Sequence, residues 1–389
     1  MSHSHAHDGA PLGPASTRVR LVVATVLTPF VVATIAGLVI LWPQDGPNPV
    51  GEFATERAHG TVVDVHSCEN DVPECLVATV DLTRGVGAPD RVEALIPFGE
   101  QAPVVSEGDR ILLTYIEEAP EDQRYGFQDF DRGRPLALLL ALFVVGVLVL
   151  SRWKGLGSLL SLALSLGLLV IFTLPALAEG DPPLLVAIVT AGAIMIGTLW
   201  LSHGFTVRTG VAILGTLLAL VCTGLLGSLF TNLGRFTGLS DEGSQYIAAI
   251  NAEVDVGGLL LAGLVIGALG VLDDVTVTQA AVVWELAAAD PDAPRTTLFA
   301  RGMRVGRAHV ASTVNTLALA YVGATLPLLL VFSALDLPFA TAVSQELVAQ
   351  EVVRGLVGGL GIIAAVPLTT ALAALVAGGL AARRRSLPT

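Results

Sequence analysis

Eight stretches of this 389-residue chain are long and apolar enough to cross a membrane as helices. The hydrocarbon core of a bilayer is about 30 Å thick, so a helix that spans it needs about 20 apolar residues. Charged residues make up only 14% of the chain, against about 25% in soluble domains. This composition excludes an ordinary cytosolic enzyme and a disordered chain, and it predicts an all-α polytopic membrane helix bundle. The eight runs lie at 19–42, 135–150, 156–178, 182–201, 211–231, 256–272, 310–333 and 355–382.

The acidic residues are concentrated in one segment between the first two runs. Residues 43–134 contain 19 Asp and Glu, 7 Arg and no Lys, so this segment carries nearly all of the net charge of −13. A nucleic-acid partner would require clustered Lys and Arg, and this charge distribution excludes one. We therefore predict an acidic soluble domain that is inserted between two membrane helices.

Basic residues fall in alternate connections between the apolar runs. Because Lys and Arg mark the cytoplasmic side of a membrane protein, one topology places all these connections and both termini in the cytoplasm. The basic residues are Arg18, Arg20, Arg152, Lys154, Arg208, Arg295, Arg301, Arg304, Arg307, Arg383, Arg384 and Arg385, while the outward connections include Glu346, Glu351 and Arg354. The predicted segments are a disordered, histidine-containing cytoplasmic tail at 1–18, an anchor at 19–42, an extracytoplasmic domain at 43–134, a seven-helix domain at 135–382 and a basic cytoplasmic tail at 383–389.

The external segment shows the alternation of polar and apolar residues that is typical of β-strands. Clusters of Gly, Pro and Asp at 85–90 and 97–109 supply the turns. Four or five strands in this segment predict a small antiparallel, OB-type barrel between spans 1 and 2. We expect a structural module or one that docks a protein partner. The candidate strands are 61–65, 76–82, 91–96 and 110–116.

Two of the three cysteines lie in the external segment. In an oxidising compartment Cys68 and Cys75 are expected to form a disulfide that closes a short loop, with two free thiols as the alternative. Cys222 lies alone in an apolar run, where helix packing explains it.

The most informative polar residues follow the run at 256–272. A charged side chain at the centre of a membrane helix costs about 2.5–3.5 kcal/mol. On a helix Asp274, Thr278 and Glu285 lie on one stripe, while Asp273 points about 100° away. The candidate site residues are Asp273, Asp274, Thr278, Gln279, Glu285 and Asn315.

Two interpretations of this polar segment remain open. In the first, the aspartates end the membrane span and the residues after them form a helix on the membrane surface. In the second, the segment extends the span and lines a polar cavity together with the run at 310–333. We expect Asp274 to be the essential carboxylate in that cavity and Asp273 to contact a different neighbour, such as the polar residues at 312–316.

The string Val-Leu-Asp-Asp-Val-Thr-Val-Thr-Gln at 271–279, followed by Trp284-Glu285-Leu286, resembles the signature of the YibE/F-like family of bacterial multi-pass membrane proteins. The order of one helix, a small domain and seven helices is similar too, so the resemblance extends over most of the chain from about residue 20. The resemblance implies a bacterial cell membrane as the location. It implies no particular substrate.

Two functional hypotheses remain open. The first is a permease in which the three carboxylates bind a cation or a proton, while the amides and Thr278 orient a small solute. The second is a membrane scaffold whose external domain docks a partner. Motifs of zinc proteases, phosphate-binding loops and serine hydrolases are absent from the sequence, so we expect no enzyme and no cofactor. The histidines His3, His5 and His7 either bind a metal from the tail or are solvated, and we predict no metal site.

Overall fold

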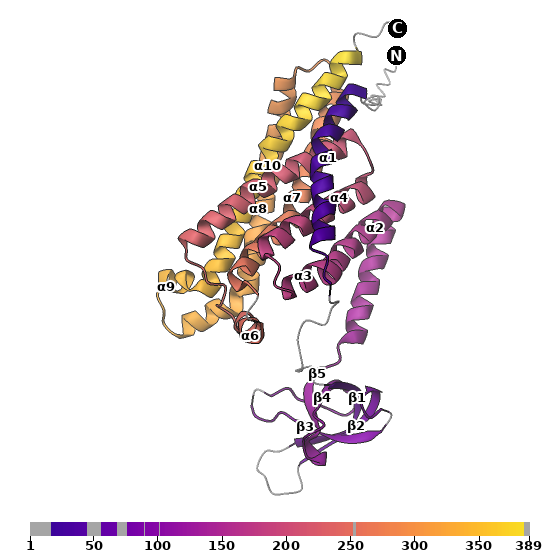
Figure 1. Cartoon of the computed structure of the whole chain (residues 1–389), viewed down its shortest axis with the longest axis vertical. Helices are drawn as coiled ribbons and strands as arrows, with labels where there is room; N and C mark the ends of the chain where they lie inside the picture. Colours follow the sequence, from indigo (N-terminus) through magenta and orange to yellow (C-terminus); the bar gives the residue numbers. More distant parts are fainter. Residues whose placement is uncertain are drawn as a thin grey trace, which may run out of the picture. The chain divides into compact units, whose positions relative to one another are not determined.

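The computed structural model describes residues 17–44, 56–67, 76–88, 90–100, 102–251 and 254–384. Contacts divide the chain into two compact units, which we call the barrel unit (Val50–Gly155) and the helical unit (Met1–Pro49 and Leu156–Thr389) (Figure 1). The predictions for His3, His5, His7, Cys68 and Cys75 concern residues outside the described part.

Within the described residues, eight helices are long and apolar enough to cross a membrane, which agrees with the predicted number. The helices are α1 (Thr17–Ile40), α2 (Gly133–Leu168), α3 (Leu174–Ala178), α4 (Pro183–His203), α5 (Val207–Leu233), α6 (Glu242–Ile250), α7 (Val256–Ala289), α8 (Arg295–Ala334), α9 (Phe339–Ser344) and α10 (Glu346–Arg384). Helix α2 is interrupted at Arg152, whose φ of 52° and ψ of −133° are not helical. This kink separates two of the eight apolar helices, Gly133–Trp153 and Gly155–Ala178.

Helix α7 is the central helix of the helical unit, because it packs against α4, α5, α8 and α10. Helix α10 also packs against α5 and α8, so these helices share one core. Helix α1 begins and α10 ends at the same end of this unit, while the short helices α6 and α9 lie at its other end (Figure 1).

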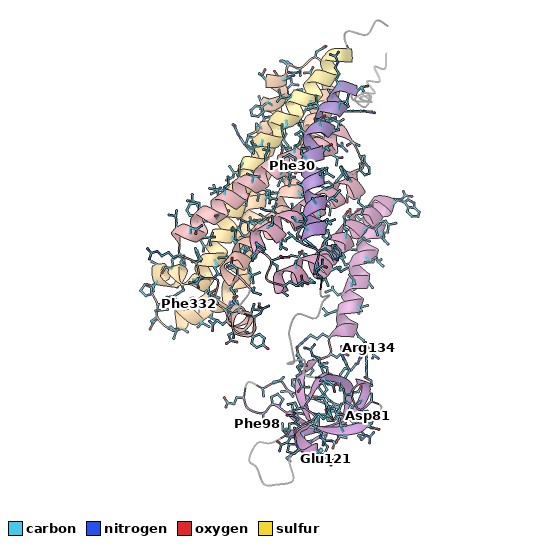
Figure 2. All side chains as sticks on the ribbon, in the orientation of Figure 1. Phe30, Asp81, Phe98, Glu121, Arg134 and Phe332 are labelled. Carbon is cyan, nitrogen blue, oxygen red and sulfur yellow. The ribbon has the colours of Figure 1, made fainter. Side chains whose placement is uncertain are left out.

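The outer surface of the helical unit is apolar. Large side chains such as Phe30, Leu319 and Leu330 are exposed, and side chains stand out along the helices in Figure 2. A soluble monomer rarely exposes a contiguous apolar patch larger than a few hundred Å². This surface is therefore of the kind that the hydrocarbon of a bilayer covers.

Two helices extend beyond the apolar runs from which they were predicted, because they continue through charged residues. The run at 256–272 becomes α7, which continues through the polar segment to Ala289, and the run at 310–333 becomes α8, which begins at Arg295. Hydropathy falls at the first charged residues, whereas the backbone hydrogen bonds of a helix continue until a breaking sequence intervenes. For α7 that sequence is the proline-containing turn at 290–294. The polar segment is therefore an integral part of α7.

Glycine residues let the central helices approach closely. A Cβ atom at Gly215 of α5 would lie 2.2 Å from Thr369 Oγ1 of α10, and one at Gly361 of α10 would lie 2.2 Å from Thr223 Oγ1 of α5. Gly224 of α5, in contrast, has no heavy atom within 4 Å of its Cβ position. Only a glycine therefore fits the first two contacts without displacing the neighbouring helix.

The strands of the barrel unit are β1 (Glu56–Ser67), β2 (Leu76–Gly85), β3 (Arg91–Ile96), β4 (Arg110–Tyr115) and β5 (Tyr125–Phe130). They form a closed barrel in the order β1-β2-β3-β5-β4. The four predicted strands are confirmed, and every pair is antiparallel except β3 with β5. The fifth strand is not apparent in the sequence, because Gln128 and Asp129 are both exposed and interrupt the alternation. Buried side chains such as Val62, Val80 and Leu113 fill the interior.

Ion pairs on the outside of the barrel hold two aspartates in their charged form. Arg91 Nε lies 2.6 Å from Asp81 Oδ1, and Arg132 Nη1 lies 2.6 Å from Asp129 Oδ2. The hydrogen bond from Arg91 lowers the pKa of Asp81. The pKa of Asp129 is lowered by the hydrogen bond from Arg132 and then by that from the Phe130 N–H. Both aspartates therefore favour the folded barrel only while they are ionised.

The lowered pKa values predict that acid destabilises the barrel. A carboxyl group whose pKa is lower in the folded state contributes stability above its unfolded pKa, about 3.9 for Asp, and loses it as the pH falls through the folded value. We expect the urea midpoint of the excised segment 43–134 to fall between about pH 5 and pH 2. The double variant Asp81→Asn/Asp129→Asn should show a weaker pH dependence. Identical pH profiles for the two proteins would contradict this interpretation.

The close contact at Gly215 predicts a specific loss of stability. We expect Gly215→Ala to lower the melting temperature of the detergent-solubilised protein, because the new methyl group overlaps Thr369 Oγ1 and overpacking costs about 1–3 kcal/mol. Gly224→Ala is the matched control, since it gains the same helix propensity without an obstructing atom. Equal melting temperatures for the two variants would show that α5 and α10 are not in this contact.

Candidate functional site

The carboxylate of Asp273 is the most unusual polar group in the helical unit. The side chain lies half-buried on α7, and its Oδ2 atom accepts a long hydrogen bond of 3.4 Å from Thr198 Oγ1 of α4. Its Oδ1 atom is buried and has no hydrogen-bond partner among the described residues. No basic side chain among the described residues forms an ion pair with Asp273. Asp273 thus lies in an apolar bundle without an ion-pair partner among the described residues.

The contact with Thr198 also fixes the depth of Asp273. Thr198 lies five residues before the end of α4 at His203, which corresponds to about 7.5 Å along a helix. His203 itself lies within electrostatic range of Asp274. Asp273, Asp274 and His203 therefore form a series of titratable groups that leads from the interior of the unit to the end of α4.

Asp274 and Glu285 lie on the exposed side of α7, and Thr278 between them is partly buried. The same side carries three exposed glycines, Gly263, Gly267 and Gly270. No heavy atom lies within 4 Å of the Cβ position of Gly263 or Gly270. The stripe that the sequence predicts is therefore present, and it follows the open face of α7. Its two carboxylates are more exposed than Asp273.

The residues on the opposite side of α7 hold the helices together. Thr276 Oγ1 lies 2.6 Å from Thr216 Oγ1 of α5. Gln279 Nε2 donates hydrogen bonds to the Gly302 carbonyl of α8 at 2.9 Å and to Thr370 Oγ1 of α10 at 2.7 Å. The amide nitrogen of Gln279 thereby uses both of its hydrogens on helix contacts.

Asn315 does not join this group in the structure. Its side chain is exposed on α8, and no hydrogen bond connects it to α7 among the described residues. Asp273 faces Thr198 of α4 and not the polar residues at 312–316 as expected. A helix-wheel argument fixes the angle between Asp273 and Asp274, but it cannot say which helix each one faces. The structure therefore brings Asp273, Asp274 and Thr278 close to one another and leaves Asn315 apart.

A second polar group lies in α10. Glu346, Glu351 and Arg354, predicted in an outward connection, lie in the first turns of this helix, which begins at Glu346, before the apolar run at 355–382. Arg354 forms an ion pair with Glu351, but its Nε atom is buried without a partner among the described residues. Arg354 follows Glu351 by three residues, which is the spacing of neighbours on a helix. This spacing is the feature of the sequence that indicates a helix here.

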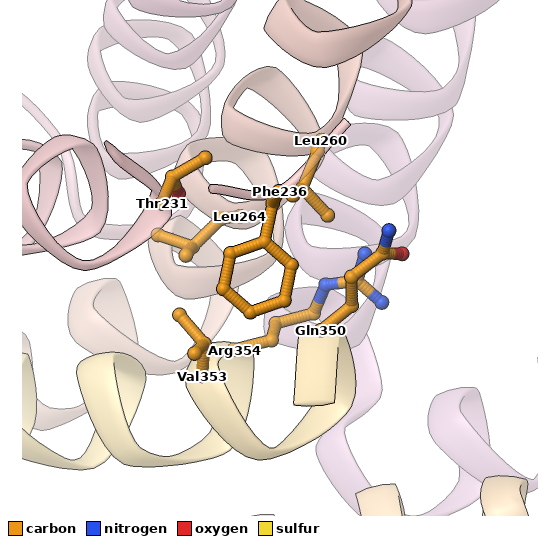
Figure 3. Close-up of a pocket in the computed structure, with 7 residues that line it drawn as sticks. All are labelled: Thr231, Phe236, Leu260, Leu264, Gln350, Val353 and Arg354. Atoms are coloured by element: carbon orange, nitrogen blue, oxygen red, sulfur yellow. The ribbon is translucent and has the colours of Figure 1, made fainter. Parts of the chain in front are cut away.

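Arg354 lines a narrow pocket together with Phe236 and Gln350 (Figure 3). Thr231 also lines it, and its Oγ1 atom is buried without a hydrogen-bond partner in the described part of the chain. The pocket leaves no room for a water molecule. We therefore treat this cluster as packing at one end of the bundle and not as a ligand site. Groups of His, Cys, Asp and Glu that could hold a metal ion are not found among the described residues.

The model of the YibE/F-like protein family matches residues 139–379. The chain belongs to the YibE/F-like family. The match begins within α2 and ends within α10, so it covers the segment with Asp273 but neither α1 nor the barrel. It is therefore shorter than the resemblance in the sequence implies. No curated protein and no solved structure matches the chain.

The hydrogen bonds of Gln279 predict a structural role for this member of the YibE/F-like family. We expect Gln279→Leu to lower the free energy of unfolding by about 1–3 kcal/mol, because buried acceptors lose their donor. Thr278→Val is the control, since the Thr278 hydroxyl forms no hydrogen bond among the described residues. Thermal unfolding in detergent distinguishes the two. A Gln279→Leu protein as stable as the control would contradict the structural role.

Proposed function

We propose that this YibE/F-like protein is a permease that moves a small solute or ion across a membrane, with Asp273 as the group that binds a cation or a proton. The observation that carries the proposal is the carboxylate of Asp273, which lies half-buried with one oxygen unpartnered among the described residues. Charged residues within membrane helices are rare, and they commonly mark ion paths and proton relays.

The cost of burying a charge supports this role. An isolated carboxylate in an apolar environment is expensive unless it binds a proton or a cation. The structure supplies no basic partner for Asp273 among the described residues. A site that is satisfied only when a cation or proton is bound is the simplest design for reversible binding. A protein that merely anchors the barrel has no use for such a group.

The surroundings of Asp273 supply a path. Asp274 lies next to it on the exposed stripe of α7, and His203 marks the end of α4. In the predicted orientation, with basic connections in the cytoplasm, this end of α4 faces inward. Thus Asp274 and His203 would exchange the cation or proton between Asp273 and the cytoplasm. Gln279 holds the helices around the site through its amide hydrogens.

The same orientation places the barrel outside the cell membrane. Its five strands, with the order β1-β2-β3-β5-β4, support the assignment to the OB type. Its acidic composition is compatible with an extracytoplasmic location because the cytoplasmic connections carry the basic residues. A bacterial plasma membrane agrees with the family.

Flux measurements with substitutions in α7 test the proposal. The protein is reconstituted in vesicles, gradients of protons, sodium, potassium or magnesium ions are applied, and each flux is followed with a dye that responds to the ion in question. We expect Asp273→Asn to reduce the flux by about tenfold or more, because the amide keeps the volume but binds neither proton nor cation. Its melting temperature should be unchanged or higher, because an uncompensated charge is removed.

Two further variants serve as comparisons. Glu285→Gln, at an exposed position near the end of α7, should leave the flux unchanged. Asp274→Asn should reduce it less than Asp273→Asn does, since Asp274 is exposed and passes on the ion without holding it. Full flux in Asp273→Asn, or an absence of flux in the wild-type protein under every gradient, would overturn the proposal.

A further inference from the structure

A pocket of about 330 Å³ lies within the barrel unit at the point where α2 begins. Its walls come from β1, β2, β4 and the first turn of α2. Pockets that bind small molecules have volumes of about 300–1,000 Å³. This pocket is large enough for a small polar ligand.

The pocket is basic, although it belongs to the most acidic part of the chain. Three of the seven arginines of residues 43–134 line it, namely Arg84, Arg110 and Arg134, and Asp131 is the only acidic residue in its lining. In Figure 2 Arg134 lies where α2 begins, and Glu121 lies at the opposite end of the barrel unit. Three arginines are therefore gathered where α2 begins.

Asp131 organises the pocket. Its Oδ1 atom accepts a hydrogen bond of 2.9 Å from the Gly133 N–H, and its Oδ2 atom lies 2.8 Å from Arg110 Nη2 and 3.6 Å from His59 Nδ1. The backbone hydrogen bond from Gly133 is the main cause of the lowered pKa of Asp131, and the charge of Arg110 adds to it. Asp131 thus stays ionised, ties the start of α2 to the barrel and orients the Arg110 guanidinium.

The remaining two arginines are available to a ligand. Arg84 and Arg134 are exposed, and neither side chain forms an ion pair or a hydrogen bond among the described residues. The pocket therefore carries two unneutralised guanidinium groups in addition to the oriented Arg110. A guanidinium presents paired N–H donors that match the oxygens of a phosphate.

The start of α2 indicates where such a phosphate comes from. From Leu136 onward the first half of this helix is apolar and exposed, with Leu136 and Leu138 at 60% and 64% exposure. Arg134 precedes Leu136 by two residues, which is about 3 Å along a helix. If α2 crosses a membrane, the pocket therefore lies at the depth of the lipid headgroups.

We propose that this pocket binds the phosphate headgroup of an anionic phospholipid at the surface where α2 enters the membrane. The proposal depends on α2 crossing the membrane, but it does not depend on transport through α7. Lipid binding at the pocket would fix the barrel at one height above the bilayer. This contact explains why Arg84 and Arg134 stand beside Arg110 without ion pairs among the described residues.

Binding of a short-chain, soluble phosphatidylglycerol to the full-length protein in detergent tests the proposal. The pocket variant is Arg84→Gln/Arg134→Gln, and the matched control Arg91→Gln/Arg124→Gln removes two arginines from the barrel outside the pocket lining. Each Arg near an anionic lipid surface contributes roughly a factor of five to binding, so the pocket variant should bind about thirtyfold more weakly. The control should bind as the wild type does.

Three further measurements test whether the barrel is intact in the variants and whether the bound phosphate belongs to a lipid. Circular dichroism should give the same strand content for both variants, which shows that the barrel is intact. Short-chain phosphatidylcholine should bind much more weakly than phosphatidylglycerol, and inorganic phosphate should not compete at equal concentration. Equal weakening in both variants would overturn the proposal, since it would indicate unspecific charge. Competition by free phosphate at equal concentration would overturn the proposal that the bound phosphate belongs to a lipid headgroup.

Discussion

The absence of water in the hydrocarbon core of a bilayer is the constraint on which the helical unit depends. Each backbone N–H and C=O group must find a partner inside its own helix, so only helices and closed barrels cross a membrane. The eight long apolar helices satisfy this requirement. Because lipid is as apolar as leucine, hydrophobic burial does not hold the helices to one another. Close packing and polar contacts between helices must do so, and this explains the glycines and threonines between α5, α7 and α10.

The polar residues of α7 fall into two sets under the same constraint. Thr276 and Gln279 are buried and fully engaged with α5, α8 and α10. Asp273 is half-buried with one oxygen that lacks a partner in the described part of the chain. The first set lowers the energy of the bundle, whereas the second raises it. A charged group within a membrane helix commonly marks an ion path or a proton relay, and this is the basis for proposing Asp273, and not Thr276 or Gln279, as the residue that binds the ion.

Much of the architecture follows from the sequence. Apolar runs give the number of helices, because length and hydropathy are sufficient to recognise a span. Alternation gives four of the five strands, and it fails at β5, where Gln128 and Asp129 are exposed side by side. Hydropathy also fails at helix ends. It stops α7 at Asp273 and starts α10 after Arg354, although the hydrogen bonds of both helices continue through these charges.

The candidate site was harder to predict than the fold. Helical spacing correctly groups Asp274, Thr278 and Glu285 on one stripe and separates them from Asp273. It cannot tell which stripe faces the interior, because that depends on how α7 packs against α4, α5, α8 and α10. Small residues on a stripe permit a close helix contact, but Gly263 and Gly270 have open space at their Cβ positions. The tertiary arrangement therefore makes Asp273 the more buried carboxylate of the pair.

The charges of the barrel unit show how the same physics acts outside the hydrocarbon. Acidic side chains are tolerated there without partners because water solvates them, so their number constrains the fold little. Position then matters more than number. If α2 crosses a membrane, an arginine beside its first apolar residues lies where anionic headgroups and water meet, and Asp131 fixes the Arg110 guanidinium in the same pocket. The net negative charge of the segment gives no indication of this basic pocket. Arg84 and Arg110 come together beside Arg134 only when the barrel closes.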